Sequence, residues 1–144
     1  MPKLYLLARI ADELVALESD HVESVVHVDD VLRVPQSDPS VAGIFALRSR
    51  VLTLIDSQFP VTGKQAPEQS RALAIIVEIC GHTYGLWVDA VEDVVSLELG
   101  KSEKNILAAG AWQKLVREFT VHDGRTIMII EPMSFVGSDI SVAA

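Results

Sequence analysis

The chain has 144 residues, 49% of them hydrophobic, and a formal net charge of −8. This length fits one domain or two small interlocked halves, and the acidic balance argues against a nucleic-acid partner, because phosphate binding needs clustered Lys and Arg. No apolar run approaches the ~18 uninterrupted residues of a membrane span, so we expect no insertion into a membrane.

The N-terminal part of the chain is typical of β-structure. Two apolar runs, Leu4–Ile10 and Leu14–Leu17, flank the turn-like Ala11-Asp12-Glu13 and predict a hairpin. The next segment, Asp20–Val28, is ambiguous. Its valines fit one face of a helix, but their number favours a strand, or a single helical turn followed by a strand.

Two short elements are expected before the centre of the chain. Val31–Val34 predicts a brief strand that Pro35 ends. Asp38 and Pro39 form a helix-start signal, with Asp38 as N-cap and Pro39 at the first helical position. The helix has room for only one or two turns before Gly43.

A second hairpin is predicted around a basic turn. The apolar runs Ile44–Leu47 and Val51–Ile55 flank the three residues Arg48-Ser49-Arg50, where a hairpin usually prefers Asn-Gly or Asp-Gly. The arginines are either solvated, paired with nearby acids, or kept for a partner. Gly43, just before the first run, indicates a positive φ or a close backbone approach.

The second half of the chain repeats the first. After the polar segment Gln58–Gln69, which predicts a loop or linker, Ile75–Leu97 aligns with Leu6–Val28 at a shift of 69 without a gap. Thr126–Glu131 aligns with Val51–Asp56 at a shift of 75. This repetition predicts a single domain, 1–144, made of two duplicated halves, 1–63 and 71–138, joined by a linker at 64–70 and sharing apolar surface.

The closing hairpin and the C-terminal end follow the same pattern. The turn Arg48-Ser49-Arg50 corresponds to Asp123-Gly124-Arg125, in which Asp-Gly is a type I′ hairpin signal. Glu131-Pro132 predicts a last short helical turn over Met133–Val136.

Residue types that carry chemistry do not form a catalytic motif. Cys80 excludes an internal disulfide and predicts a small buried thiol in a reducing compartment, and the first residues lack a signal-peptide pattern, so we expect a cytoplasmic protein. Asp56 and Glu131 end strands at matching positions, which duplication explains more simply than a carboxylate pair. Trp87 either packs in the core or anchors a partner. Four histidines are scattered without metal-ligand spacing: His21, His27, His82 and His122. We therefore expect no catalytic residue, no metal and no cofactor.

Three stretches together resemble the CheW-type chemotaxis adaptors. Gly43–Asp56 is similar to the family's glycine, Leu-Arg turn and strand ending in Val/Ile-Asp, and Gly85–Val94 resembles its Gly-x-x-Val-Asp-x-Val-x-x-Val signature. Phe119–Glu131 resembles its closing hairpin. The resemblance extends from about Leu4 to Val136 and implies an all-β fold with short helices, built of two pseudo-symmetric five-stranded SH3-like barrels around an apolar core.

The resemblance also implies a function. Such an adaptor is a non-catalytic scaffold that links a chemoreceptor hairpin tip to the regulatory domain of a histidine kinase, with the receptor helix in a groove between the halves. It is recruited to membrane receptors without entering the membrane, and we expect a monomer on its own. Val22 would supply apolar area, Gly43 a close approach, and Arg48 a charge for a receptor glutamate. The candidate partner-binding residues are Val22, Val25, Gly43, Arg48, Ser49 and Arg50.

Three departures from the family pattern suggest a divergent member. Ser49 replaces the glycine after the arginine, so either the turn differs or Ser49 is strained. Ser24 replaces an acidic residue and Ala46 an asparagine. Because these changes fall on stretches that face partners, the alternative is a CheW-like module with a non-standard partner, or one that blocks assembly. The remaining hypothesis is a small β-barrel enzyme or a ligand-binding protein.

Overall fold

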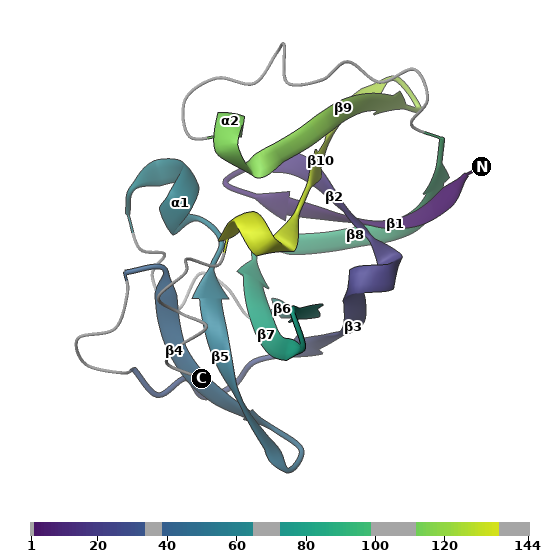
Figure 1. Ribbon diagram of the computed structural model, residues 1–144. Coiled ribbons are helices and arrows are strands. Elements are labelled where there is room, and N and C mark those ends of the chain that lie inside the picture. Colours follow the sequence, from purple (N-terminus) through teal and green to yellow (C-terminus); the bar gives the residue numbers. More distant parts are fainter. Residues whose placement is uncertain (1, 34–38, 65–72, 99–111, 136–144) are drawn as a thin grey trace.

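The protein is built almost entirely of strands, as Figure 1 shows for this computed structural model, which describes residues 2–33, 39–64, 73–98 and 112–135. The strands are β1 (Lys3–Ile10), β2 (Glu13–Glu18), β3 (Val22–His27), β4 (Val41–Leu47), β5 (Arg50–Asp56), β6 (Leu73–Ile79), β7 (His82–Val88), β8 (Ala90–Leu97), β9 (Val116–His122) and β10 (Arg125–Ile130). The helical turns are η1 (Ser19–His21), α1 (Phe59–Thr62), α2 (Trp112–Leu115) and η3 (Pro132–Phe135). The expected all-β class with short helices is confirmed.

The ten strands form two sheets that repeat each other. The first sheet has the order β8-β1-β2-β10-β9 and the second the order β3-β6-β7-β5-β4. Replacing each strand of the first sheet by its counterpart in the sequence repeat reproduces the second sheet, so the expected pseudo-symmetric pair of five-stranded units is confirmed. Neither sheet closes into a barrel within the described residues, because no pairing joins β8 to β9 or β3 to β4.

Each sheet takes strands from both halves of the sequence. The β1–β2 hairpin pairs with β8 on one side and β10 on the other, while β6 and β7 pair with β3 and β5. Figure 1 shows β1, β2, β8, β9 and β10 in the upper layer and β3 to β7 below it. The repeated halves are therefore interlocked. Of the expected linker 64–70, only Lys64 lies within the described residues.

Left-handed turns connect the equivalent hairpins β1–β2 and β6–β7. Ala11 and Asp12 have φ values of 51° and 68°, and Cys80 and Gly81 have values of 51° and 83°. Two successive positive φ values fit the type I′ turn that matches strand twist. The expectation of a buried thiol was wrong, because this turn leaves Cys80 exposed at the tip of the β6–β7 hairpin.

The ambiguous segment after β2 is a turn followed by a strand. One 3-10 turn, η1, precedes β3, whose residues alternate between half-buried and exposed. This alternation places one face of β3 against the core and the other toward solvent. The alternative of a continuous helical face is excluded.

The segment before β4 differs from the prediction. Instead of a strand, only Leu32 pairs, through two 2.9 Å backbone hydrogen bonds with Ile44; Val34 and Asp38 lie outside the described residues. The helix start at Pro39 was also wrong, because Pro39 and Ser40 form a turn and β4 begins at Val41. The Ser40 carbonyl accepts a 2.7 Å bond from the Asp56 amide, so a tertiary contact with β5 replaces the local helix.

A short helix occupies the start of the segment that was expected to be a loop. Helix α1 has Pro60 in its first turn and ends at Gly63 with φ of 75°, an arrangement typical of helix starts and stops. The Asp56 carboxylate accepts a 2.9 Å bond from the Gln58 amide just before it. At the other end of the chain, η3 confirms the expected last helical turn, one residue earlier than predicted.

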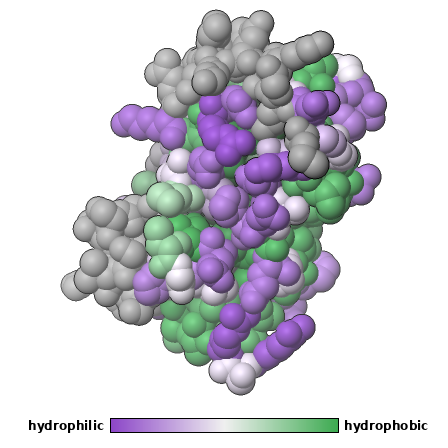
Figure 2. All heavy atoms as spheres, turned by 45° about the vertical axis from the view of Figure 1, so that its right-hand side comes forward, coloured by the Kyte–Doolittle hydropathy of each residue, from purple (hydrophilic) through white to green (hydrophobic). Residues whose placement is uncertain are grey.

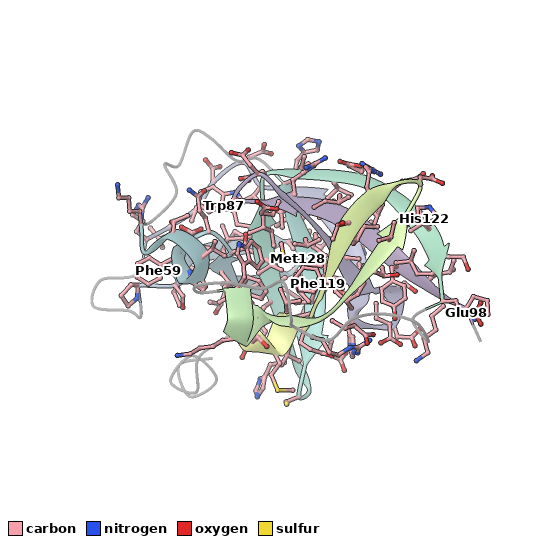
Figure 3. The ribbon with its side chains drawn as sticks, turned by 90° about the horizontal axis from the view of Figure 1, so that it is seen from above. Phe59, Trp87, Glu98, Phe119, His122 and Met128 are labelled. Atoms are coloured by element: carbon pink, nitrogen blue, oxygen red, sulfur yellow. The ribbon has the colours of Figure 1, made fainter. Side chains whose placement is uncertain are left out.

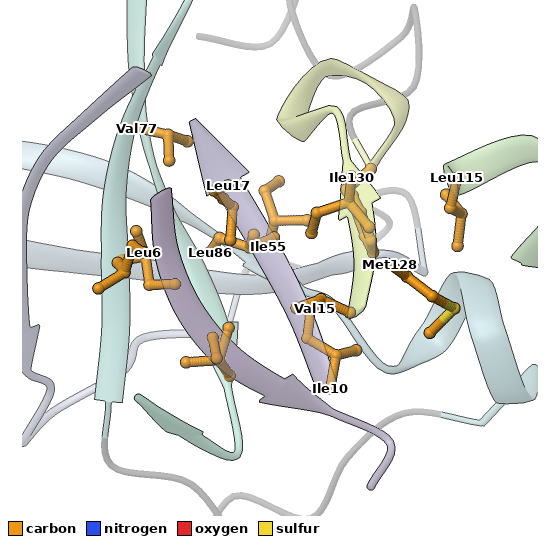
Figure 4. Close-up of a cluster of buried hydrophobic side chains, with 14 of the residues drawn as sticks. Leu6, Ile10, Val15, Leu17, Ile55, Val77, Leu86, Leu115, Met128 and Ile130 are labelled. Carbon is orange, nitrogen blue, oxygen red and sulfur yellow. The ribbon is translucent and has the colours of Figure 1, made fainter. Parts of the chain in front are cut away.

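The largest hydrophobic cluster lies between the two sheets. Figure 4 shows Leu6, Ile10 and Val15 of the first sheet packed with Ile55 and Leu86 of the second. The two units therefore share one core, as expected for small β-units that bury little apolar surface alone.

A second cluster contains Trp87, which is only 2% exposed and packs with Leu54 and Ile76. Of the two interpretations of this tryptophan, the structure supports packing in the core over anchoring a partner. Figure 3 places Trp87 away from Phe119 and Met128, which lie opposite each other in β9 and β10 and belong to the central cluster.

Candidate functional site

The β4–β5 hairpin projects from the second sheet and ends in a two-residue turn (Figure 1). Leu47 pairs with Arg50, so Arg50 is the first residue of β5 and the turn is Arg48-Ser49, one residue shorter than predicted. Arg48 has a φ of 57°, whereas Ser49 has no positive φ. The equivalent hairpin has positive φ at both Asp123 and Gly124. The turn therefore differs from its repeat, and the left-handed conformation falls on Arg48 rather than on Ser49.

Gly43 makes room for a neighbouring segment of the same chain. A Cβ at this position would lie 2.6 Å from the Leu32 carbonyl oxygen and 2.6 Å from Cγ1 of Val31. Its φ of 152° is also one that other residues rarely adopt. The close approach predicted from the sequence is thus an intramolecular one, which fixes Leu32 against the outer edge of β4.

An apolar hollow of about 360 Å³ opens between this segment and the hairpin. Its lining is almost entirely hydrophobic, and Leu32 and Val51 remain 67% and 68% exposed. The lining residues are Asp30, Val31, Leu32, Ile44, Phe45, Ala46 and Val51. Figure 2 shows hydrophobic side chains gathered at the lower end of the molecule, the end that carries the hairpin, with hydrophilic side chains crossing it. Exposed apolar groups collected in this way are typical of protein-binding surfaces.

The two arginines of the hairpin differ in their partners. Arg50 Nη2 lies 3.0 Å from Oε2 of Glu23 on β3, so this arginine is already paired. Arg48 is exposed, and no carboxylate within the described part of the chain pairs with it. The candidate surface therefore combines an apolar hollow with one available guanidinium.

The remaining predicted contact residues lie on the opposite edge strand of the same sheet. Val22 is half-buried against the central core, and Val25 is 37% exposed. Their counterparts in the repeat, Val91 and Val94, behave alike, and Val94 is 50% exposed. The structure thus places the predicted residues on two elements, β3 and the β4–β5 hairpin, which the Arg50–Glu23 contact joins.

Sequence reasoning missed three members of this surface: Leu32, Val51 and Glu23. The first two were assigned to strands, and a strand pattern does not reveal which side chains stay exposed. Glu23 did carry a signal, because it is one of the positions identical in the repeat, where it matches Glu92.

The histidines and carboxylates of the described segments are dispersed over the fold. Among the described residues, no group of three or more His, Cys, Asp or Glu could hold a metal ion. His21 lies near Glu18, while His122 lies near Asp123 at the far end of β9 (Figure 3). Within the part of the chain that the structure describes, no helix is long and apolar enough to cross a membrane.

The two strand-end carboxylates have separate structural roles. Asp56 is buried before α1 and accepts the Gln58 amide, whereas Glu131 accepts a 2.8 Å bond from Arg117. They lie at the ends of β5 and β10, in different sheets.

Two other glutamates are held in their charged form by basic neighbours. The hydrogen bond from Lys3 lowers the pKa of Glu18, and hydrogen bonds from Arg125 and Arg9 lower the pKa of Glu92. Both carboxylates are more acidic in the folded protein than the ordinary value of 4.5. Their pairing therefore stabilises the fold only while they remain ionised.

We expect the free energy of unfolding to decrease as the pH falls below the ordinary glutamate pKa of 4.5. The unfolded chain takes up these protons first, so the stabilisation is complete above that pKa and is lost as the pH falls through the lowered folded values. Urea midpoints measured between about pH 3 and pH 7 should show this slope, and Glu18→Gln with Glu92→Gln should flatten it. An unchanged slope in the double variant would assign the acid sensitivity to other carboxylates.

Comparisons with known proteins agree on one family. The model of the CheW-like domain matches residues 4–139. Among solved structures, the chain is similar to the scaffolding protein TtCheW from Thermoanaerobacter tengcongensis, with a TM-score of 0.82 and 28% sequence identity over 96% of this chain and 95% of that one. No curated protein matches the sequence.

Proposed function

The chain belongs to the CheW-like domain family, and from this premise we propose that it is a non-catalytic scaffold that couples a chemoreceptor tip to the regulatory domain of a histidine kinase. The observation that carries the proposal is the exposed apolar hollow, together with Arg48 at the tip of the same hairpin, which pairs with no carboxylate of the described residues. Such a surface suits a protein partner, because apolar area supplies affinity and the charge supplies specificity. The similarity to a scaffolding protein over almost the whole chain supports it.

The kinase contact is proposed for the hollow, so Arg48 is assigned here to the kinase domain and not to the receptor glutamate that the resemblance implied. An aliphatic or aromatic side chain of the regulatory domain would enter between Leu32 and Val51, and a carboxylate beside it would pair with Arg48. The arginine fork favours a carboxylate over other groups, because it can donate two parallel hydrogen bonds. Asp30 lines the hollow, and its negative charge would disfavour an acidic side chain of the partner inside the hollow itself.

The receptor contact, which the resemblance implied for a groove between the halves, is proposed here for the valines of the other edge strand, β3. Val22 and Val25 offer apolar area to an amphipathic helix. Their repeat counterparts Val91 and Val94 offer a similar pair on β8. Because β3 and β4 are opposite edges of one sheet, the proposed receptor and kinase sites do not compete for the same residues.

One observation favours a second candidate, a CheW-like module with a non-standard partner or a blocking role. Ala46 lines the hollow and Ser49 lies in the turn, so two of the three departures from the family pattern fall on the proposed kinase surface. Ser24, the third, lies on β3. In either case we propose that the protein works in the cytoplasm as a monomer without a cofactor, and that nucleic acid is not a partner.

The test is assembly with purified components. We expect the full chain to co-elute with a histidine kinase regulatory domain from the same source, and to retain it when a cytoplasmic receptor fragment is added. Binding of both partners at once supports the scaffold. Binding of the kinase domain with exclusion of the receptor would support the blocking module, and binding of neither would overturn both.

A further inference from the structure

Two ion pairs occupy equivalent places in the two sheets. In the second sheet Arg50 Nη2 lies 3.0 Å from Glu23 Oε2, and in the first sheet Arg125 Nη1 lies 2.9 Å from Glu92 Oε1. In each case the arginine is the first residue of the second hairpin strand, and the glutamate belongs to an edge strand. The same arginine–glutamate contact is therefore present in both repeated units.

Local irregularities direct both glutamates toward these arginines. The pairing of β3 with β6 shifts register between Val22 and Ser24, which places Glu23 at the shift. The pairing of β8 with β1 shifts between Val94 and Val91, the stretch that contains Glu92. A β-bulge bends its strand and re-aims the side chain of the extra residue, so both acids are turned in the same way.

The Arg50–Glu23 pair joins two strands that are not neighbours. Strands β7 and β6 separate β5 from β3, which in a flat sheet corresponds to about 14 Å. The pair therefore bridges the open side of a curled sheet. Because Arg50 closes the turn by pairing with Leu47, fixing Arg50 also fixes the backbone that carries Arg48.

The two sheets differ in how strongly the pair is supported. Arg9 adds a second 3.0 Å contact to Glu92, but the position equivalent to Arg9 in the second sheet is Glu78. Within the described residues, Glu23 has Arg50 as its only basic partner. Among the described residues, one ion pair therefore ties the tip of the β4–β5 hairpin to β3, in addition to its own strand pairing.

We propose that Arg50 and Glu23 form a positioning clip, which holds the β4–β5 turn so that Arg48 and the apolar hollow face the kinase domain. Arg50 acts through Arg48 and does not itself contact the partner. Both side chains are about half exposed, so the pair contributes little to global stability, and its main effect is on the geometry of the turn. This inference rests on the proposed function and assigns a role within the same site.

The test is a charge exchange with a matched control in the other sheet. We expect Glu23→Arg and Arg50→Glu each to weaken binding of the kinase regulatory domain by about threefold to tenfold, because the binding-competent turn is less populated. The double exchange should restore the affinity to within about twofold. The equivalent variants Glu92→Arg and Arg125→Glu should leave the affinity unchanged. A double exchange that binds as weakly as Arg50→Glu alone would overturn the proposal, because Arg50 would then be a direct contact.

Hydrogen exchange tests the clip without a partner. In Glu23→Gln, amides of the β4–β5 turn should exchange faster than in the unsubstituted protein, while those of the β9–β10 turn should not change. Equal exchange at both turns would overturn the clip even if the kinase domain binds. If the unsubstituted protein binds no kinase domain but the turn exchanges faster, only the proposed function fails.

Discussion

Gly43→Ala is expected to lower the free energy of unfolding by about 3 kcal/mol, because the new methyl group has no space and the backbone has no suitable conformation. Its Cβ would meet the Leu32 carbonyl oxygen and Val31 Cγ1 at 2.6 Å, and one of those atoms belongs to backbone. The Leu32–Ile44 bridge must then separate or β4 must shift. Urea unfolding, followed by far-UV circular dichroism, measures the loss.

Gly81→Ala is the matched control for the cost of placing alanine in a backbone conformation with positive φ. Gly81 has a φ of 83°, and a Cβ there would meet nothing within 4 Å. This variant should cost about 1 kcal/mol, which is the penalty for a left-handed alanine alone. If Gly43→Ala costs no more than Gly81→Ala, the close approach of Val31 and Leu32 does not constrain the fold, and Gly43 returns to being a candidate for direct contact with a partner.

Arg48→Glu is expected to weaken binding of the kinase regulatory domain by about 1–3 kcal/mol, which is about fivefold to 150-fold in affinity. The substitution removes the guanidinium at the tip of the hairpin that lines the hollow, and it places a negative charge opposite the proposed carboxylate. Because Arg48 is exposed and pairs with no acid in the described part of the chain, the free energy of unfolding should change by less than about 0.5 kcal/mol. Isothermal titration calorimetry and thermal melting give the two quantities separately.

Two control variants test whether the effect of Arg48→Glu comes from a contact at this position, from the change in net charge, or from backbone strain at residue 48. Lys64→Glu makes the same charge reversal at an exposed residue after α1, and it should leave the affinity unchanged. Arg48→Gly removes the cation but suits the φ of 57°, so it should weaken binding while stability stays equal or rises by at most about 1 kcal/mol. A large fall in melting temperature for Arg48→Glu would instead show that this side chain supports the fold.

Most of the strands, the repeat and the resemblance to the family could be predicted from the residues alone, whereas the strand expected at Val31–Val34 did not form. The apolar runs Leu4–Ile10 and Val51–Ile55 lie within β1 and β5, because a short apolar run bounded by turn residues is a local property of the sequence. The repeat at shifts of 69 and 75 predicted two equivalent five-stranded units. The repeat could be found in advance because it depends only on the order of the residues in the sequence.

Local signals failed where distant segments decided the outcome. The helix start at Pro39 was overridden when Ser40 bonded to the Asp56 amide, a contact 16 residues away in the chain (56 − 40 = 16). Cys80 was assigned to the core from its apolar neighbours, yet the turn that it occupies points outward. In both cases the local preference is small compared with strand pairing and burial.

How the halves interlock, and which of the two arginines is available, depends on contacts between distant parts of the chain. The exchange of strands between sheets follows from burying one shared core, and the pairing of Arg50 with Glu23 follows from the curl that this burial imposes. In the sequence, nothing distinguishes the two arginines of this turn as partners for an acidic group. They become different because the curled sheet brings a glutamate from the opposite edge strand to Arg50, whereas no glutamate of the described residues pairs with Arg48.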